Sequence, residues 1–303
     1  MKDRVLLFLK GMAMGAADVV PGVSGGTIAF ITGIYDQLLG ALSRIPQAAW
    51  LLLQGQFKRA WQLADANFLL ILFAGIACSI LTFARLITWL LDTQPIALWS
   101  FFFGLIVVSC FLVARDVQHW RFSRWLALAC GVAFAWWITV AAPVTWGQDP
   151  LSLFAAGAIA ICAMILPGIS GSFILLLMGL YPTVLLAVKQ LDFSVLAVFA
   201  VGCLFGLLAF AHVLRMALER FRDVTLALLV GVMLGSLNKV WPWKKTLAWR
   251  ADSHGQQVPF SQENILPWQF AEQFQVDAQL MPALVLMLLG IVLVIAIERY
   301  AGQ

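Results

Sequence analysis

The sequence predicts an all-α polytopic membrane protein built from two inverted-topology repeats, and three observations lead to this fold class. The first is composition: 62% of the 303 residues are hydrophobic and 11% are charged, whereas soluble domains carry about a quarter charged residues. The second is an internal repeat, and the third is an uneven distribution of Lys and Arg between the loops. A nucleic-acid partner is excluded, because the net charge of +4 is small and the basic residues lie in short loops.

The internal repeat has a constant offset of 146 residues. The stretch PGVSGGTIAFITGIYDQLLGA begins at residue 21, and PGISGSFILLLMGLYPTVLLA begins at residue 167. Ten of the twenty-five positions from 17 to 41 match their partners, namely Ala17, Pro21, Gly22, Ser24, Gly25, Ile28, Gly33, Tyr35, Leu39 and Ala41. A weaker match continues at an offset of 127. The chain is therefore interpreted as a duplication, with repeat 1 at 1–147 and repeat 2 at 148–303.

Each repeat is predicted to contain one broken, re-entrant hairpin followed by three transmembrane helices. Repeat 1 has its hairpin at 4–41 and its spans at 68–91, 96–114 and 125–144, and repeat 2 has its hairpin at 151–187 and its spans at 193–213, 224–240 and 281–297. The spans suit a hydrocarbon core about 30 Å thick. The apolar stretch before each break reaches only about 24 Å as a helix. A segment that enters and leaves on the same side fits this length better than two complete spans.

The Lys and Arg distribution predicts the orientation. A hairpin adds no net crossing and three spans add an odd number, so repeat 2 is inverted relative to repeat 1. Thirteen basic residues fall on the N-terminal side: Lys2, Arg4, Lys10, Arg44, Lys58, Arg59, Arg115, Arg121, Arg124, Arg215, Arg220, Arg222 and Arg299. Five fall on the other side: Lys189, Lys239, Lys244, Lys245 and Arg250. The positive-inside rule then places both termini in the cytoplasm.

The break in each hairpin is predicted to bind an anion. Its residues are Pro21, Gly22, Pro167 and Gly168. Irregular backbone at membrane depth is tolerated only where it lines a cavity or contacts a ligand. A new half-helix follows each break, with a serine at its N-cap position, and the free amides and dipole at a helix start attract negative charge. The predicted anion cradle consists of Ser24, Gly25, Gly26, Thr27, Ser170, Gly171 and Ser172.

Two other interpretations of the breaks compete with this one. They could be flexible kinks that pack against neighbouring helices, but the duplication of Pro, Gly, Ser and Gly together favours ligand contact. The letters GVSGG also fit the G-x-S-x-G nucleophile elbow. That motif needs a strand, a His and an acid, and the second copy reads G-x-S-x-S. We therefore favour the anion cradle over both.

Two ionisable residues stand out in apolar surroundings. Asp18 has no equivalent in repeat 2, where Met164 takes its place, and it could carry a coupling proton, bind a cation or cap local amides. Arg85 would lie about 10 Å from the outer end of its helix, where it could extend to the headgroups or pair with a phosphate. His212 occupies the matching position in repeat 2 and is predicted to be a packed side chain. No metal site or cofactor is predicted, since the five cysteines occur singly.

The stretches AADVVPGVSGGTIAFITGIYDQLL and LPGISGSFILLLMGLY resemble the PopT-like polyprenyl-phosphate transporters, a bacterial family formerly known as a domain of unknown function. The similarity covers essentially the whole chain. It implies a flippase in the bacterial cytoplasmic (inner) membrane, not an enzyme. Its substrate would be undecaprenyl phosphate, moved from the outer to the inner leaflet to recycle the lipid carrier of peptidoglycan and other envelope glycans. By this resemblance, the Ser24–Thr27 and Ser170–Ser172 tips hold the phosphate while the polyprenyl tail stays among membrane lipids.

Charge movement adds an expectation of ion coupling. A negative headgroup that moves inward works against an inside-negative potential, at roughly 2.3 kcal/mol per charge per 100 mV, and Asp18 is the candidate proton carrier. One rival is an enzyme that resembles undecaprenyl-diphosphate phosphatase, with a PG-x-S-R-S motif. Gly25 and Gly171 occupy its arginine position here, and its acidic motif is absent. A transporter of another anion is the other rival. No role is predicted for the outer loop at 239–280.

Overall fold

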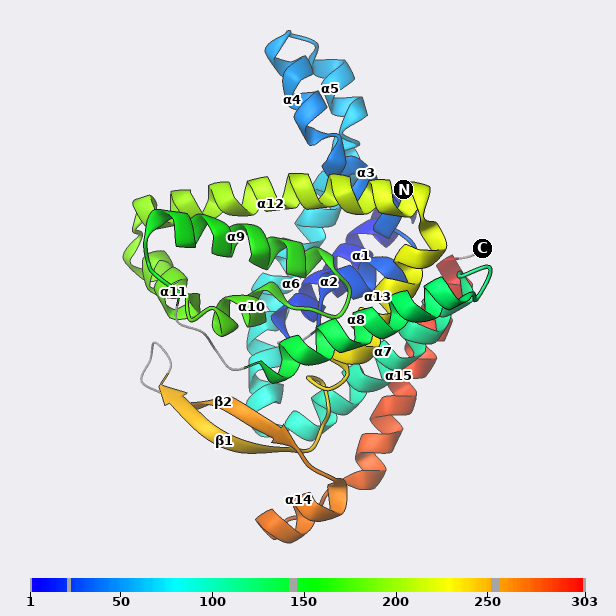
Figure 1. The fold of residues 1–303 in the computed structure, drawn as a ribbon, viewed down its shortest axis with the longest axis vertical. Coiled ribbons are helices and arrows are strands. Elements are labelled where there is room, and N and C mark those ends of the chain that lie inside the picture. The colour runs from blue at the N-terminus through cyan, green and yellow to red at the C-terminus, as the bar shows by residue number, and fades with distance from the viewer. Residues whose placement is uncertain (1, 21–22, 142–145, 252–256, 302–303) are drawn as a thin grey trace.

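The computed structural model describes residues 2–20, 23–141, 146–251 and 257–301, most of which are helical (Figure 1). Five helices of this described part are long and apolar enough to cross a membrane: α6 (Ala66–Thr93), α7 (Pro95–Arg115), α8 (Phe122–Val140), α12 (Phe193–Arg220) and α15 (Leu280–Ala301). The predicted span at 224–240 corresponds to the shorter helix α13 (Arg222–Ser236). Hydrogen-bonded turns at 237–240 follow it in place of a last helical turn. The protein is thus a mostly helical, polytopic membrane protein.

The two predicted hairpins each contain three helices. They are α1 (Lys2–Val19), α2 (Gly25–Ile31) and α3 (Tyr35–Ser43) in the first, and α9 (Pro150–Ile165), α10 (Gly171–Leu177) and α11 (Tyr181–Gln190) in the second. One break was predicted in each hairpin, but a second bend follows the short helix, α2 or α10. It lies at Gly33 (φ 72°) and at Gly179 (φ 71°), and the axes of α10 and α11 differ by 110°. Glycine permits this bend because it adopts positive φ at no steric cost.

The largest helix interfaces join four pairs: α1 with α6, α9 with α12, α7 with α15, and α8 with α13. Glycines allow the backbones of these pairs to approach closely, as small residues commonly do in membranes. A Cβ atom added to Gly75 of α6 would lie 2.3 Å from the carbonyl oxygen of Phe8, and one added to Gly202 of α12 would lie 2.1 Å from that of Phe154. No larger residue fits at these two positions without moving a helix.

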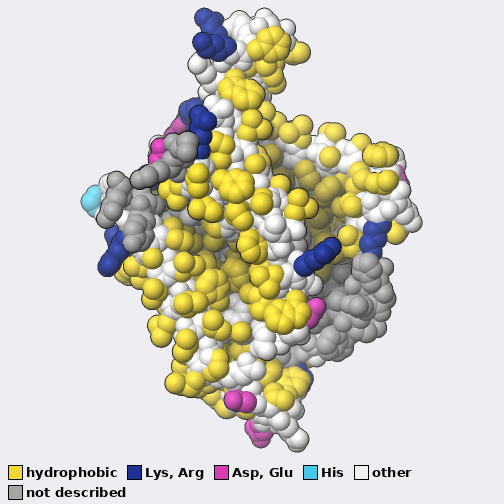
Figure 2. All heavy atoms as spheres, turned by 180° about the vertical axis from the view of Figure 1, so that it is seen from behind, with side chains coloured by type: hydrophobic (Ala, Val, Ile, Leu, Met, Phe, Trp, Pro, Cys, Tyr) yellow, Lys and Arg dark blue, Asp and Glu magenta, His cyan; other side chains and the backbone are white. Residues whose placement is uncertain are grey.

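The helices differ in how much of their surface faces outward. In the most apolar stretch of α7, 67% of the residues are buried, whereas only 11% are buried in the corresponding stretch of α12. Hydrophobic side chains cover most of the face shown in Figure 2, and charged side chains are sparse on it. A surface of this kind is suited to lipid. Helix α7 therefore lies in the protein core, and α12 lies at its surface.

Two segments lie outside the helical bundle. One is a pair of short helices, α4 (Ile45–Leu53) and α5 (Phe57–Leu63), which projects at the top of Figure 1. The other contains α14 (Pro267–Phe274) and an antiparallel hairpin of β1 (Lys244–Ala251) and β2 (Gln257–Asn264). These strands are a departure from the expected all-α fold. The buried Trp243, just before β1, anchors the hairpin by donating a hydrogen bond from Nε1 to the Ala278 carbonyl oxygen at 2.8 Å.

Candidate anion-binding site at the hairpin tips

The two hairpin tips lie in direct contact. Ser24 Oγ donates to the Met164 carbonyl oxygen at 2.9 Å, and the Gly168 amide donates to Thr27 Oγ1 at 3.0 Å. Tyr35 supplies a third link, from its hydroxyl to the Ile165 carbonyl oxygen at 3.1 Å. The carbonyls of Met164 and Ile165 lie at the end of α9, where a helix has no internal partner for them. Side chains of the first hairpin therefore satisfy the backbone of the second.

The first tip is closed by its own side chains. The Gly25 amide donates to Asp18 Oδ1 at 2.6 Å, and the Gly26 amide donates to Ser24 Oγ at 3.0 Å. The Thr27 amide donates to the Ser24 carbonyl oxygen at 2.9 Å. Ser24 and Thr27 are both fully buried. Asp18 thus occupies the position where a bound anion would accept hydrogen bonds from the start of α2, which is the amide-capping role among those considered for it.

The second tip is built differently, although its motif is nearly the same. Ser170 stands at the N-cap position of α10, but its side chain accepts no amide of that helix. Its hydroxyl is instead hydrogen-bonded to the Ser172 hydroxyl at 2.8 Å. Met164 stands where repeat 1 has Asp18, so the equivalent carboxylate is missing, and Ser172 is exposed. The start of α10 therefore has hydroxyl groups and no capping carboxylate.

Gly168 fixes the shape of this second tip. Its φ of 89° lies in the left-handed region that favours glycine. A Cβ at Gly168 would also lie 2.7 Å from Ser236 Oγ and 3.1 Å from the Met233 Cα. The tip consequently packs against the end of α13. Pro167 is buried beside it, while Pro21 and Gly22, the corresponding residues of the first break, lie outside the described residues.

Two lysines near the second tip were missed in the sequence analysis, which counted them only as loop charges. Lys239 follows the end of α13, and its Nζ lies 4.5 Å from the ring centroid of Phe173, the residue after Ser172. Lys244 Nζ lies 3.9 Å from the ring centroid of Trp99 and donates to the Lys239 carbonyl oxygen at 2.7 Å. Neither lysine makes an ion pair with a described residue. The sequence contains no motif that connects these two lysines with the second tip.

Burial lowers the pKa of both lysines. For Lys244 the pKa is well below the usual value, because desolvation and then the nearby charge of Lys239 both disfavour a second positive charge. For Lys239 the cause is desolvation alone. Both ammonium groups thus lie near the second tip without an acidic partner among the described residues.

The remaining predicted residues lie elsewhere. Arg85 is exposed on α6 and makes no hydrogen bond or ion pair with a described residue, so both interpretations of it stay predictions. His212 was expected to be packed, but it is exposed on α12 because that helix turns this position outward. Within the described ranges, no three His, Cys, Asp or Glu side chains gather closely enough to hold a metal ion.

Comparisons with known proteins agree on one family. Residues 14–258 match the VCA0040-like family, which is described as undecaprenyl phosphate translocase-like. A polyprenyl-phosphate transporter of Vibrio cholerae serotype O1 is 52% identical over 297 residues, which cover 98% of this chain and 96% of that protein. A polyprenyl-phosphate transporter of Staphylococcus aureus strain NCTC 8325 is 32% identical over 253 residues, covering 77% and 85%. No solved structure matches the chain.

Proposed function

Because the chain belongs to the undecaprenyl phosphate translocase-like family, we propose that it is a flippase for undecaprenyl phosphate in the bacterial cytoplasmic membrane. In this proposal it moves the lipid from the outer to the inner leaflet for carrier recycling, and both of its termini are cytoplasmic. It acts as a transporter and not as an enzyme. The relatives named above are transporters, which supports this choice.

The pattern of helix contacts supports the inverted-repeat part of the proposal. In repeat 1 (1–147) the first hairpin helix α1 packs on α6, and in repeat 2 (148–303) α9 packs on α12. Between the repeats, α7 packs on α15 while its counterpart α13 packs on α8. Each interface of one copy therefore has a counterpart in the other. Secondary transporters built this way bind their substrates at the interface between repeats.

The phosphate is proposed to bind first at the second tip, where Ser170, Gly171 and Ser172 have no capping carboxylate. The observation that carries this proposal is the contrast with the first tip, where a carboxylate occupies the same place. Lys239 supplies the compensating positive charge, since it lies beside Phe173 without an acidic partner. Hydrogen bonds to a charged phosphate are about twice as strong as neutral ones. The polyprenyl tail stays outside, along the exposed apolar surface of α12.

Asp18 is proposed to control access to the first tip. While ionised, it holds the Gly25 amide and repels a second anion. A proton on Asp18 removes that charge and frees the Gly25 amide for the phosphate. The same proton offsets the electrical work of inward charge movement, roughly 2.3 kcal/mol per charge per 100 mV. Proton coupling and phosphate binding would then depend on one hydrogen bond.

The test is leaflet exchange of undecaprenyl phosphate in liposomes that contain the purified protein. The Ser170→Ala/Ser172→Ala variant should lose most of its exchange rate, while Ser123→Ala, an exposed serine at the start of α8, should match the wild type. Equal rates for the tip variant and the control would refute the site. No exchange by the wild type would refute the function. Release of phosphate from undecaprenyl diphosphate by the pure protein would favour the enzyme instead.

A further inference from the structure

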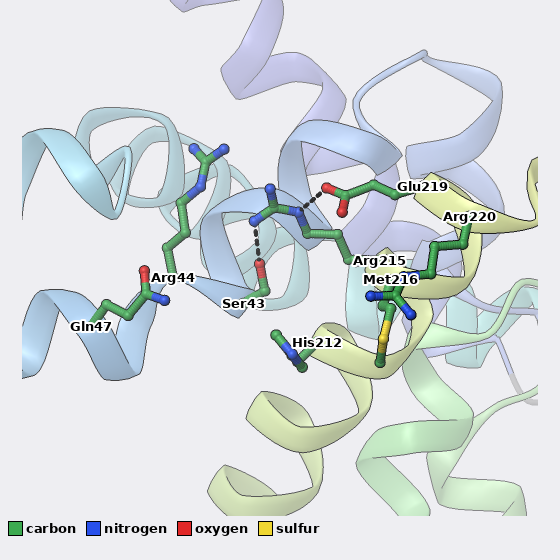
Figure 3. A pocket seen from close by; sticks show the side chains of 8 residues that line it. All are labelled: Ser43, Arg44, Gln47, His212, Arg215, Met216, Glu219 and Arg220. Carbon is green, nitrogen blue, oxygen red and sulfur yellow. Dashed lines mark hydrogen bonds and ion pairs between the residues drawn. The ribbon is translucent and has the colours of Figure 1, made fainter.

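A cavity of about 390 Å³ lies between the end of α3 and the last turns of α12 (Figure 3). Its lining residues are mostly polar: Ser43, Arg44, Gln47, His212, Arg215, Met216, Glu219 and Arg220. Three guanidinium groups thus face one carboxylate. From the sequence, these arginines were predicted only to lie on the cytoplasmic side of the membrane, and no common site was predicted for them.

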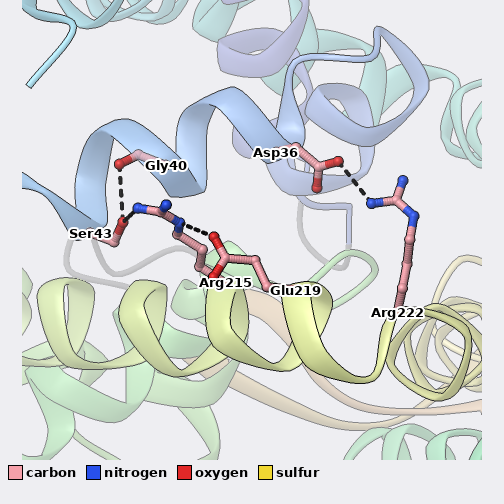
Figure 4. Close-up of polar contacts among 6 residues, drawn as sticks. All are labelled: Asp36, Gly40, Ser43, Arg215, Glu219 and Arg222. Carbon is pink, nitrogen blue, oxygen red and sulfur yellow. Dashed lines mark hydrogen bonds and ion pairs between the residues drawn. The ribbon is translucent and has the colours of Figure 1, made fainter.

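One of the three arginines is held in a fixed position. Arg215 Nη1 donates to Ser43 Oγ at 3.0 Å, and its Nε donates to Glu219 Oε1 at 2.7 Å (Figure 4). Ser43 is buried and donates in turn to the Gly40 carbonyl oxygen at 3.0 Å. This chain of hydrogen bonds joins α12 to α3. Its bond from Arg215 to Glu219 also engages the carboxylate found among the lining residues named above.

The other two arginines keep their charges uncompensated. The side chains of Arg44 and Arg220 make no hydrogen bond or ion pair with any residue that the structure describes. Arg222 differs from these two arginines, because its Nη1 lies 3.3 Å from Asp36 Oδ2 outside the cavity (Figure 4). Asp36 therefore pairs outside the cavity, and Glu219 inside it is already bound by Arg215. An anion is the ligand that this arrangement lacks.

The cavity is connected to the hairpin tips through α3. That helix begins at Tyr35, whose hydroxyl bonds the second hairpin, and it ends at Ser43, which bonds Arg215. Nine helical residues span about 13 Å. The cavity lies on the side of the N-terminus, by the charge distribution, and so faces the inner leaflet. A headgroup that leaves the tips toward the cytoplasm meets this cavity next.

We propose that the cavity binds a phosphate monoester at the cytoplasmic surface, as the landing site of the headgroup after translocation. Arg44 and Arg220 engage the phosphate oxygens, because planar guanidinium groups match phosphate in a bidentate geometry. Arg215 adds its positive charge while it keeps its bonds to Ser43 and Glu219. The volume suits a headgroup, and the tail lies in the adjacent lipid. This assignment rests on the proposed function, but the same chemistry also fits free inorganic phosphate.

The test measures binding of farnesyl phosphate, a short prenyl monophosphate, to the purified full-length protein by calorimetry. The Arg44→Gln/Arg220→Gln variant should bind at least tenfold more weakly than the wild type, since it loses two charge-assisted contacts. The matched control is Lys58→Gln/Arg59→Gln, which removes equal charge from α5 on the same side. It should bind like the wild type. Gln at 44 and 220 breaks no side-chain hydrogen bond or ion pair of the described residues, and an unchanged melting temperature confirms the fold.

The outcomes separate the two proposals. If the arginine variant binds like its control while the wild type still exchanges undecaprenyl phosphate in liposomes, the landing site is refuted and the function stands. If the wild type shows no exchange but the arginine variant loses binding, the anion site stands and the function fails. Arg220→Glu, which adds a carboxylate to the cavity, should bind no better than the double variant, and wild-type binding by it would also refute the site.

Two further ligands identify the source of the phosphate. Farnesol, which lacks the phosphate, should not compete with farnesyl phosphate, and competition by farnesol would overturn a site that recognises phosphate. Inorganic phosphate that competes as well as farnesyl phosphate would assign the cavity to the free ion. If inorganic phosphate competes only at a much higher concentration than farnesyl phosphate itself needs to bind, the cavity is assigned to the lipid headgroup.

Discussion

The two hairpin tips share the order Pro, Gly, x, Ser and Gly, yet they differ in what their helix starts bind. At the first tip the Gly25 amide is held by Asp18, and Ser24 caps Gly26. At the second, Ser170 caps no amide and bonds Ser172 instead. Aligned side chains differ at the tips, since Asp18 corresponds to Met164 and Gly26 to Ser172. The tips therefore share a motif, while their side chains satisfy the helix start of the first and leave that of the second available.

The strongest way to break this comparison is to give the second tip its own carboxylate. In Met164→Asp the new side chain starts 3.5 Å from where a Cβ of Gly171 would lie, so it can reach the start of α10. Competition with the phosphate should lower leaflet exchange about a hundredfold, as expected for like charges at one site. Met164→Asn serves as the uncharged control and should stay within about threefold of the wild type. Equal loss in both variants would indicate a packing defect and contradict the electrostatic explanation.

A second change removes the charge from the first tip. Asp18→Asn keeps an oxygen that can accept from the Gly25 amide, but it cannot carry a proton. We expect a maximal exchange rate about tenfold lower, with the pH dependence of the wild type lost. Exchange should be measured while the external pH is varied, with Asp36→Asn, whose side chain pairs with Arg222 at the surface, as the control. Wild-type rates for Asp18→Asn at every pH would eliminate Asp18 as the coupling residue.

A third change concerns the cation beside the second tip. Lys239→Gln should lower the leaflet exchange rate about fivefold, the effect of one partly screened charge. Burial lowers the pKa of Lys239, so the ammonium loses its proton at a lower pH than an ordinary lysine. The wild-type exchange rate should therefore fall as the pH is raised, and Lys239→Arg should hold its rate to a higher pH. Lys245→Gln on β1 is the control, and an equal loss there would assign the effect to general surface charge.

The smallest expected effect belongs to Arg85. Its side chain is exposed on α6 and makes no contact with either tip through a hydrogen bond in the described chain. Arg85→Gln should change the exchange rate less than about twofold, as is usual for surface substitutions. A loss as large as that of Asp18→Asn would mean that Arg85 pairs with the phosphate. The phosphate would then be bound by Arg85 in addition to the two tips.

Much of the helical organisation could be predicted because it depends on local pattern. Apolar length located the spans, and Ser24 and Ser170 stand at N-cap positions as expected. The second bends at Gly33 and Gly179 were overlooked, although both glycines belong to the repeated motif. The β-hairpin at 244–264 was missed because its strands are polar and lie outside the bundle.

The interactions that distinguish the two tips could not be predicted, because they join residues far apart in the sequence. Tyr35 and Ile165 are separated by 130 residues, and Ser43 and Arg215 by 172. Hydrophobic patterns specify which residues are buried but not which polar groups meet. Asp18 was identified as unusual, but its capping of Gly25 across the break depends on how the chain turns there. Sequence thus indicated the chemistry of the site, and the fold determined how its members are paired.

The glycine-mediated helix pairs have a mechanical consequence. Helices α7, α8, α13 and α15 are joined to one another through their tight pairs and through contacts between α7 and α13, so they form one rigid framework. Each hairpin is fastened to its own long helix, α1 to α6 and α9 to α12. The hydrogen bonds between the tips, and that of Arg215 with Ser43, connect the two assemblies, so any movement of one against the other must break them.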